Sequence, residues 1–234
     1  GGQGEAALDL TGAALALQAD PRAPEKEDEE FFSPEPQPLF EKWYYQRILD
    51  NTVPVLAQAQ GIAAVRLLAD LLSSAIELSR KRKEDETDED YLYIWHPAIE
   101  EGKDLDHLPS ALICATRDAA EQVIRSDSAQ FSVILGDLKA RKWISFCRLV
   151  LHLCRVFDEA GLEEASEQFQ DPEILDRGST RHEAVLLLKT VFPRLSATIQ
   201  AGLLWWIERG PDKEGVRRWL GDKATEQNVK DFYE

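Results

Sequence analysis

The alternation of apolar and polar positions is most distinctive in residues 141–157 (RKWISFCRLVLHLCRVF). Its polar residues recur every three or four positions, so on a helix they fall on one narrow stripe. These polar residues are Arg141, Lys142, Ser145, Arg148, His152 and Arg155. A surface helix is apolar over about a third of its circumference, whereas this segment is apolar over most of it. The pattern predicts a central helix that neighbours cover on several sides, with one positively charged edge.

Residues 62–83 have the same design. Apolar residues occupy most of the helical circumference, and the polar residues form a single stripe. That stripe consists of Arg66, Asp70, Ser73, Ser74, Glu77 and Arg80. Two such helices, separated by other helical segments, favour a layered helical stack, because each layer of a stack is covered by the layers before and after it.

Shorter helices are predicted around these two. Pro38 stands near the start of a helix over residues 38–50, and Thr52 is expected to cap a separate helix with Pro54 in its first turn. Further helices are predicted over residues 110–125, 131–138, 181–191, 197–209, 211–220 and 225–232. Short turns between helices favour antiparallel hairpins, and no strand pattern of period two is present. The predicted fold class is all-α, with stacked helical hairpins in an irregular HEAT-like α-solenoid or a compact multi-helix bundle.

The chain divides into two predicted regions. Residues 1–37 combine a weakly helical start, interrupted by Gly12, with an acidic, proline-rich arm. Proline removes helical donors and like charges repel, so the arm is expected to be extended. Residues 38–234 form the helical-repeat domain, and an acidic stretch marks a candidate sub-boundary near residues 160–178.

The charge balance narrows the choice of partner. The chain has 234 residues, with 43 acidic and 27 basic side chains, and its net charge is −16. Such a surface argues against nucleic acid and against an anionic membrane. No apolar run is long enough for a transmembrane helix, and no signal peptide is evident. The three cysteines lie in apolar helical contexts and are typical of a reduced, cytoplasmic protein. The absence of methionine and the Gly-Gly start suggest a piece of a larger protein.

Motifs of known chemistry are not found. The sequence has neither a phosphate-binding loop nor a dinucleotide-binding glycine motif. His182 and Glu183 begin a helical zinc motif, but Leu186 stands where its second histidine belongs. Cys147 and Cys154 share a helical face that His152 does not share, so the three side chains do not converge on a metal. No catalytic residue, cofactor or metal site is therefore predicted.

The cationic stripe and the aromatic residues are the candidates for binding a partner. Arg148, His152 and Arg155 either pair with the protein's own carboxylates at a solvated edge or bind an acidic or phosphorylated partner through arginine forks. The aromatic candidates either pack in the core or contribute to an interface, where such side chains are enriched. They are Trp43, Tyr45, Trp95 and Trp206.

Three stretches resemble a known class of protein. Residues 39–49 (LFEKWYYQRIL), 90–101 (DYLYIWHPAIEE) and 181–212 are similar to the C-terminal helical regions of large bacterial STAND-type P-loop NTPases of anti-phage defence. The Phe-Pro-x-Leu-Ser turn and the Trp-Ile-Glu-x-Gly-Pro-Asp segment carry most of the likeness, which covers about a quarter of the chain. The NTPase motifs are absent, so the resemblance implies the non-catalytic, ligand-sensing part, a helical array that recognises a foreign or partner protein. It assigns no role to a particular residue.

These observations predict a non-catalytic protein-interaction domain of a larger cytoplasmic bacterial protein. One alternative is an all-helical hydrolase that uses carboxylates with His96 or His107. A tight pocket that brings His96 together with Asp88 or Glu100 would favour the enzyme, and a shallow groove would argue against it. The other alternative is a structural oligomerisation module.

Overall fold

The fold was analysed in a computed structural model, which describes residues 2–23, 33–80, 90–100, 107–210, 214, 217–218, 221 and 225–231. For Trp95 and residues 229–231 the description is limited to the backbone. The predicted helix over residues 211–220, the arm over residues 24–32 and Asp88 lie wholly or largely outside the described residues.

Helices form nearly all of the regular structure in the described residues, which confirms the predicted all-α fold. The α-helices are α1 (Gly2–Ala14), α3 (Lys42–Gln60), α4 (Ile62–Ser79), α5 (Leu92–Trp95), α6 (Leu108–Ser126), α7 (Phe131–Lys139), α8 (Ile144–Val156), α9 (Leu162–Gln168), α10 (Arg181–Val191), α11 (Ala197–Arg209) and α13 (Glu226–Asp231). In the part of the chain that the structure describes, short 3₁₀ helices connect them, namely η1 (Ser128–Gln130), η2 (Pro172–Leu175) and η3 (Phe192–Arg194).

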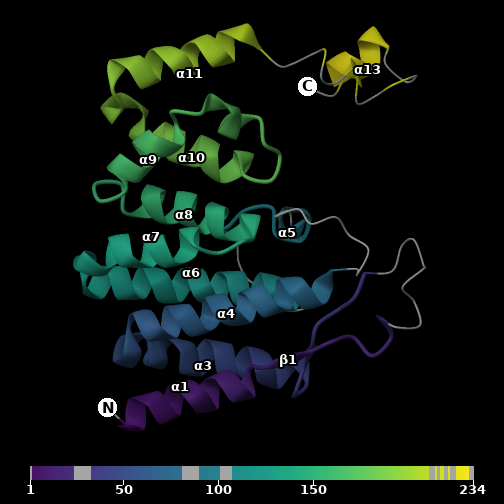
Figure 1. The fold of residues 1–234 in the computed structure, drawn as a ribbon, viewed down its shortest axis with the longest axis vertical. Coiled ribbons are helices and arrows are strands. Elements are labelled where there is room, and N and C mark those ends of the chain that lie inside the picture. The colour runs from purple at the N-terminus through teal and green to yellow at the C-terminus, as the bar shows by residue number, and fades with distance from the viewer. Residues whose placement is uncertain are drawn as a thin grey trace.

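The helices are stacked along the long axis of the molecule, with α1 at one end and α11 towards the other (Figure 1). Each layer packs chiefly against the layers next to it in the sequence: α3 and α4 against α6, α6 and α7 against α8, and α8 against α9 and α10. This order describes an open stack of helical layers, and it places α4, α6 and α8 in the interior.

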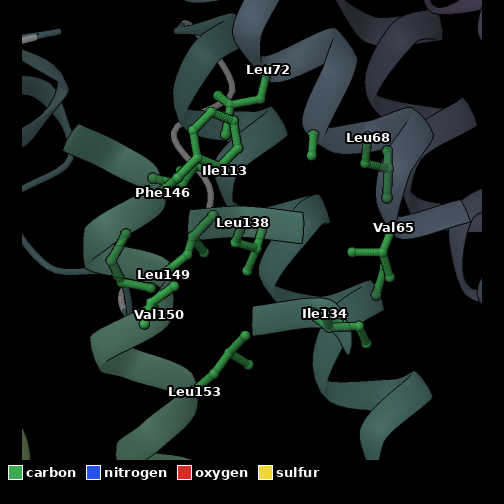
Figure 2. Close-up of a cluster of buried hydrophobic side chains, with 14 of the residues drawn as sticks. Val65, Leu68, Leu72, Ile113, Ile134, Leu138, Phe146, Leu149, Val150 and Leu153 are labelled. Carbon is green, nitrogen blue, oxygen red and sulfur yellow. The ribbon is translucent and has the colours of Figure 1, made fainter. Parts of the chain in front are cut away.

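The central position predicted for α4 and α8 is confirmed. Their apolar side chains converge on α7 and α6 between them (Figure 2). The labelled members of this cluster are Val65, Leu68, Leu72, Ile113, Ile134, Leu138, Phe146, Leu149, Val150 and Leu153, and all are buried. Full burial of such a side chain contributes about 1.5–3 kcal/mol, so this cluster is a major source of stability.

The prediction of two helices around Thr52 is wrong, because α3 continues unbroken from Lys42 to Gln60. Pro54 lies inside this helix and cannot donate a hydrogen bond to the carbonyl oxygen of Asp50. Both residues lie on the exposed side of α3, where water can replace a lost backbone hydrogen bond.

The first helix is joined to the stack. α1 packs against α3 and α4, and the two-residue strands β1 (Leu17–Gln18) and β2 (Gln37–Pro38) pair in antiparallel register. Leu15 is fully buried between these elements. The Arg22 side chain is the main reason why the pKa of Asp20 is held well below its usual range. The described parts of residues 1–37 therefore form the first layer of the same stack, and α9 and η2 continue the stack through residues 160–178.

Candidate functional site

Arg148 lies inside the protein, so its predicted place on a solvated edge is wrong. Its side chain is fully buried, because α10 and the segment after α5 cover this face of α8. Its Nη2 and Nε atoms donate to the two carboxylate oxygens of Glu183, at 2.7 and 3.1 Å, and Nη2 also donates to the carbonyl oxygen of Pro97. Glu183 in turn accepts a bond from the backbone N–H of Ile99. A guanidinium held in this way is not available to a partner.

His152 is likewise occupied by the protein's own side chains. It is 4% exposed, and its Nε2 lies 2.8 Å from a carboxylate oxygen of Glu121. Its Nδ1 lies 3.3 Å from Nη2 of Arg155, which has only protons to donate. Nδ1 is therefore the acceptor, and the imidazole carries its proton on Nε2 and donates it to Glu121. Arg155 is half-buried and occupied by this contact. Pairing within the protein is thus observed for Arg148 and His152, but in a buried setting.

Asp90 adds a third carboxylate to this interior region. One of its oxygens accepts the backbone N–H of Ser145 in the first turn of α8, at 2.8 Å, and the other accepts that of Leu92 at 3.1 Å. Burial raises the pKa of Asp90, although these bonds and the charge of Arg148 act in the opposite direction. Asp90, Glu121, Arg148, His152, Arg155 and Glu183 are referred to below as the internal polar network.

His96 does not converge with Glu100, as the hydrolase alternative would require. Its ring is 2% exposed, and its Nε2 lies 3.8 Å from the buried thiol of Cys114. Glu100 instead contacts Nε2 of His182 at 2.7 Å. A histidine and a thiol that are both closed off from solvent offer no access to a substrate, so this pair does not support a hydrolase.

The other candidate nucleophiles and bases are also hydrogen-bonded within the fold or buried. Nδ1 of His107 lies 2.8 Å from the hydroxyl of Ser110 at the start of α6. Burial raises the pKa of the Cys147 thiol, and it raises that of Cys154 to about 12. A thiol with a raised pKa is a poor nucleophile at neutral pH. Among the described residues, no group of three metal-ligating side chains is arranged around a common point.

The residues Trp43-Tyr44-Tyr45 at the start of α3 divide between core and surface. Tyr45 is fully buried, and its hydroxyl donates to the carbonyl oxygen of Leu15, so its predicted place in an interface is wrong. Trp43 and Tyr44 are 57% and 55% exposed, and their rings meet edge to face at 4.7 Å. The exposed pair is therefore Trp43 with Tyr44, since α1 packs against α3 and Leu15, just after α1, covers the side that carries Tyr45.

Trp206 is half-buried on α11. Its indole N–H donates to a carboxylate oxygen of Asp176 at 3.0 Å, and the guanidinium of Arg209 lies 5.1 Å from the ring. The side chain of Trp95, the remaining aromatic candidate, lies outside the described residues.

A groove of about 450 Å³ lies beside the exposed aromatic pair on α3. We call it the α3 groove, and its lining residues are Phe40, Tyr44, Arg47, Ile48, Asn51 and Thr52. Its surface is mainly apolar, and its polar lining residues are Arg47, Asn51 and Thr52. The guanidinium of Arg47 lies 4.9 Å from the centre of the Trp43 ring, at a distance typical of a cation–π contact.

Sequence reasoning missed Phe40, Tyr44 and Arg47 as candidate binding residues. A signal was present, because residues 40, 44, 47, 48 and 51 follow the three- and four-residue spacing of a single helical face. The spacing alone did not distinguish this face from the one that carries Tyr45, since both are rich in aromatic and aliphatic residues.

A second apolar surface lies on α11. Leu204, Trp205 and Ile207 are 49%, 60% and 57% exposed, whereas Leu203 is buried against the stack. The guanidinium of Arg209 lies 5.8 Å from the centre of the Trp205 ring. This helix therefore turns one apolar side to the stack and presents another to solvent.

Comparison with protein-family models, with curated proteins and with solved structures gives no match. The likeness to STAND-type NTPases therefore stays a prediction. Within the described part of the chain, no helix has the length and apolar character needed to cross a membrane.

Proposed function

We propose that this chain is a protein-binding helical stack with no catalytic activity of its own, and that its binding site is the α3 groove with Trp43. The single observation that carries the proposal is the exposed Trp43–Tyr44 pair beside an apolar hollow. Large aromatic side chains dominate the binding energy of protein interfaces, and exposed ones next to a concave apolar surface are typical anchors.

The positions of the charged residues support a binding role over an enzymatic one. The best candidates for acid–base or anion-binding chemistry belong to the internal polar network, where Arg148 of α8 is paired with Glu183 and His152 with Glu121. The described groove offers Arg47 and the side chains of Asn51 and Thr52, but no pair of carboxylates or histidine. Shape and apolar contact are therefore what it can contribute to a partner.

The proposal extends to the larger protein that contains this stack and to its location in the cell. An open stack of helical layers exposes long surfaces and suits recognition of another protein. The resemblance to STAND-type NTPases supports a sensing part of a larger bacterial protein in anti-phage defence, in which binding here shifts an equilibrium elsewhere. Buried thiols and the acidic surface favour a cytoplasmic location and a protein partner rather than nucleic acid or membrane.

Selection of random peptides displayed on phage tests the proposal, because it samples many candidate partners at once. We expect the wild-type protein to enrich a family of peptides with apolar anchors, and the Trp43→Ala/Tyr44→Ala variant to enrich none of them. Val133→Ala is the matched control, because Val133 is an exposed apolar residue on α7. Equal enrichment by all three proteins, each with unchanged helical circular dichroism, would contradict the proposed site.

A second function is favoured by the exposed apolar surface of α11. Two copies that bury Leu204, Trp205 and Ile207 against each other would form an oligomerisation module. Light scattering across a range of concentrations separates the two functions. A mass that rises with concentration, and that Trp205→Ala returns to the monomer value, would support self-association through α11.

A further inference from the structure

The chemistry of the partner is indicated by Arg47, the cation that lines the α3 groove. Among the described residues, no carboxylate forms an ion pair with its guanidinium, which instead lies on the face of Trp43. Other exposed arginines of this acidic chain do have such partners. Arg66 pairs with Asp137 at 2.7 Å, and Arg194 pairs with Asp158 at 2.6 Å.

The contact of Arg47 with Trp43 restrains the position of the charge, because the guanidinium carbon lies 4.9 Å from the centre of the ring. The N–H donors that do not face the ring can bind a carboxylate with two parallel hydrogen bonds. Such a cation–π contact at an exposed site restricts the rotamers of Arg47, so less entropy is lost when a partner binds.

The remainder of the groove lining is suited to an apolar side chain. Phe40, Ile48 and the ring of Tyr44 supply its apolar wall. Asn51 donates its amide N–H to the carbonyl oxygen of Arg47 at 2.8 Å, which leaves its side-chain oxygen as an acceptor. The groove thus presents an apolar wall next to a single cation, and its complement is an apolar group next to an anion.

We propose that the α3 groove binds a peptide segment in which an aromatic or branched aliphatic side chain is followed closely by an aspartate or glutamate. The apolar side chain packs against Phe40, Tyr44 and Ile48, and the carboxylate pairs with Arg47. This inference rests on the proposed function, since it specifies the partner of the same groove.

The dimensions of the helix set the spacing of the two groups in the peptide. Tyr44 and Arg47 are three residues apart, which is roughly 4.5 Å along the axis of α3. An extended peptide advances about 3.3 Å per residue, so the carboxylate is expected one or two residues from the apolar anchor. The net charge of −16 repels an acidic peptide at long range. Screening limits that repulsion to about 8 Å at physiological salt, so the nearby guanidinium has the larger effect on the bound segment.

The test extends the phage selection with Arg47→Glu. We expect the wild-type protein to enrich peptides with an acidic residue one or two positions from the apolar anchor, and Arg47→Glu to enrich lysine or arginine there instead. Arg47 is exposed and forms no ion pair within the described residues, so this substitution should leave the fold intact. Circular dichroism checks this directly.

Fluorescence anisotropy with one enriched peptide then isolates the contact. Replacing the acidic residue of the peptide by its amide should weaken binding to the wild type about two- to five-fold, in the range of well-formed exposed charge pairs, and should not weaken binding to Arg47→Gln any further. Equal weakening of both proteins by the amide peptide would overturn the assigned contact.

The outcomes separate this inference from the proposed function. Enrichment of apolar peptides without an acidic preference, abolished by Trp43→Ala/Tyr44→Ala, would overturn the inference and leave the binding site in place. The absence of any enriched family with the wild-type protein would overturn both.

Discussion

Arg148 of α8 and Glu183 of α10 form a bidentate ion pair with side-chain exposures of only 0% and 2%. The pair also contacts the backbone of residues 97 and 99, so it connects α8, α10 and the segment after α5. A buried charge is costly unless it is paired and hydrogen-bonded, which makes this contact sensitive to the loss of either partner.

Removal of one partner of this pair should destabilise the protein strongly. We expect Arg148→Met or Glu183→Gln to lower the free energy of unfolding by about 3–5 kcal/mol, because the remaining group stays buried without its partner. The double variant Arg148→Met/Glu183→Leu should lose less than either single variant. Urea unfolding followed by circular dichroism measures all three. Arg194→Gln is the control, since its partner Asp158 is substantially exposed, and a loss of at most about 1 kcal/mol is expected.

Stability should fall in acid partly through Glu121. Burial alone would raise the pKa of Glu121, but the bonds from His152 and Arg125 outweigh it and hold the pKa below its ordinary value. Glu121 therefore contributes stability above the unfolded-state pKa of about 4.3, and this contribution is lost as the pH falls through the lower folded-state pKa.

The Glu121→Gln variant tests that pH dependence. Its free energy of unfolding should vary less steeply with pH below about 5 than that of the wild type, because one linked proton is removed. Glu208→Gln, at an exposed position of α11, provides a control for the loss of a carboxylate. If the free energy of unfolding fell equally steeply with decreasing pH for Glu121→Gln and the wild type, the pKa of Glu121 would not be lowered on folding.

The sequence was sufficient to predict the layers of the fold, because the burial of α4 and α8 follows from apolar residues around most of each helix. It was not sufficient to predict the partners of the polar stripe of α8. A pattern along one helix does not show that Glu121 and Glu183, far away in the chain, lie opposite His152 and Arg148. One signal was available: Glu183 lies four residues before Leu187 on the buried face of α10, where a lone carboxylate requires a partner.

The candidate binding surface was predicted only in part. Trp43 was identified, but the choice of Tyr45 over Tyr44 depended on which side of α3 the first helix covers. Leu15, to which Tyr45 is hydrogen-bonded, lies 30 positions earlier in the chain. Composition and spacing show that α3 is aromatic on more than one side, whereas the packing of α1 determines which side remains exposed.

Pro54 provides a test of the continuous α3 helix. Substitution by alanine restores a backbone donor in the middle of a helix, and proline in such a position costs about 3 kcal/mol relative to alanine. The gain in unfolded-chain entropy offsets about 0.4–1 kcal/mol of this. We therefore expect Pro54→Ala to stabilise the protein by roughly 2–2.6 kcal/mol in urea unfolding. A loss of stability would instead favour a helix that begins at this proline. Val55→Ala, at an exposed neighbouring position, is the control and should change stability little.

Gly161 marks the closest backbone approach at the turn between α8 and α9. A Cβ atom placed there would lie 2.6 Å from Cα and 2.7 Å from the carbonyl oxygen of Cys154, and backbone atoms cannot rotate away. We expect Gly161→Ala to lower the free energy of unfolding by about 2–3 kcal/mol, as overpacking in a buried position does.

Gly136→Ala is the matched control, because nothing lies within 4 Å of its added Cβ. That variant should be more stable than the wild type by about 0.5–1 kcal/mol, since alanine is the better helix former in α7. Thermal and urea unfolding of the two variants should therefore give changes of opposite sign, and equal changes would show that the turn at Gly161 has room for a side chain.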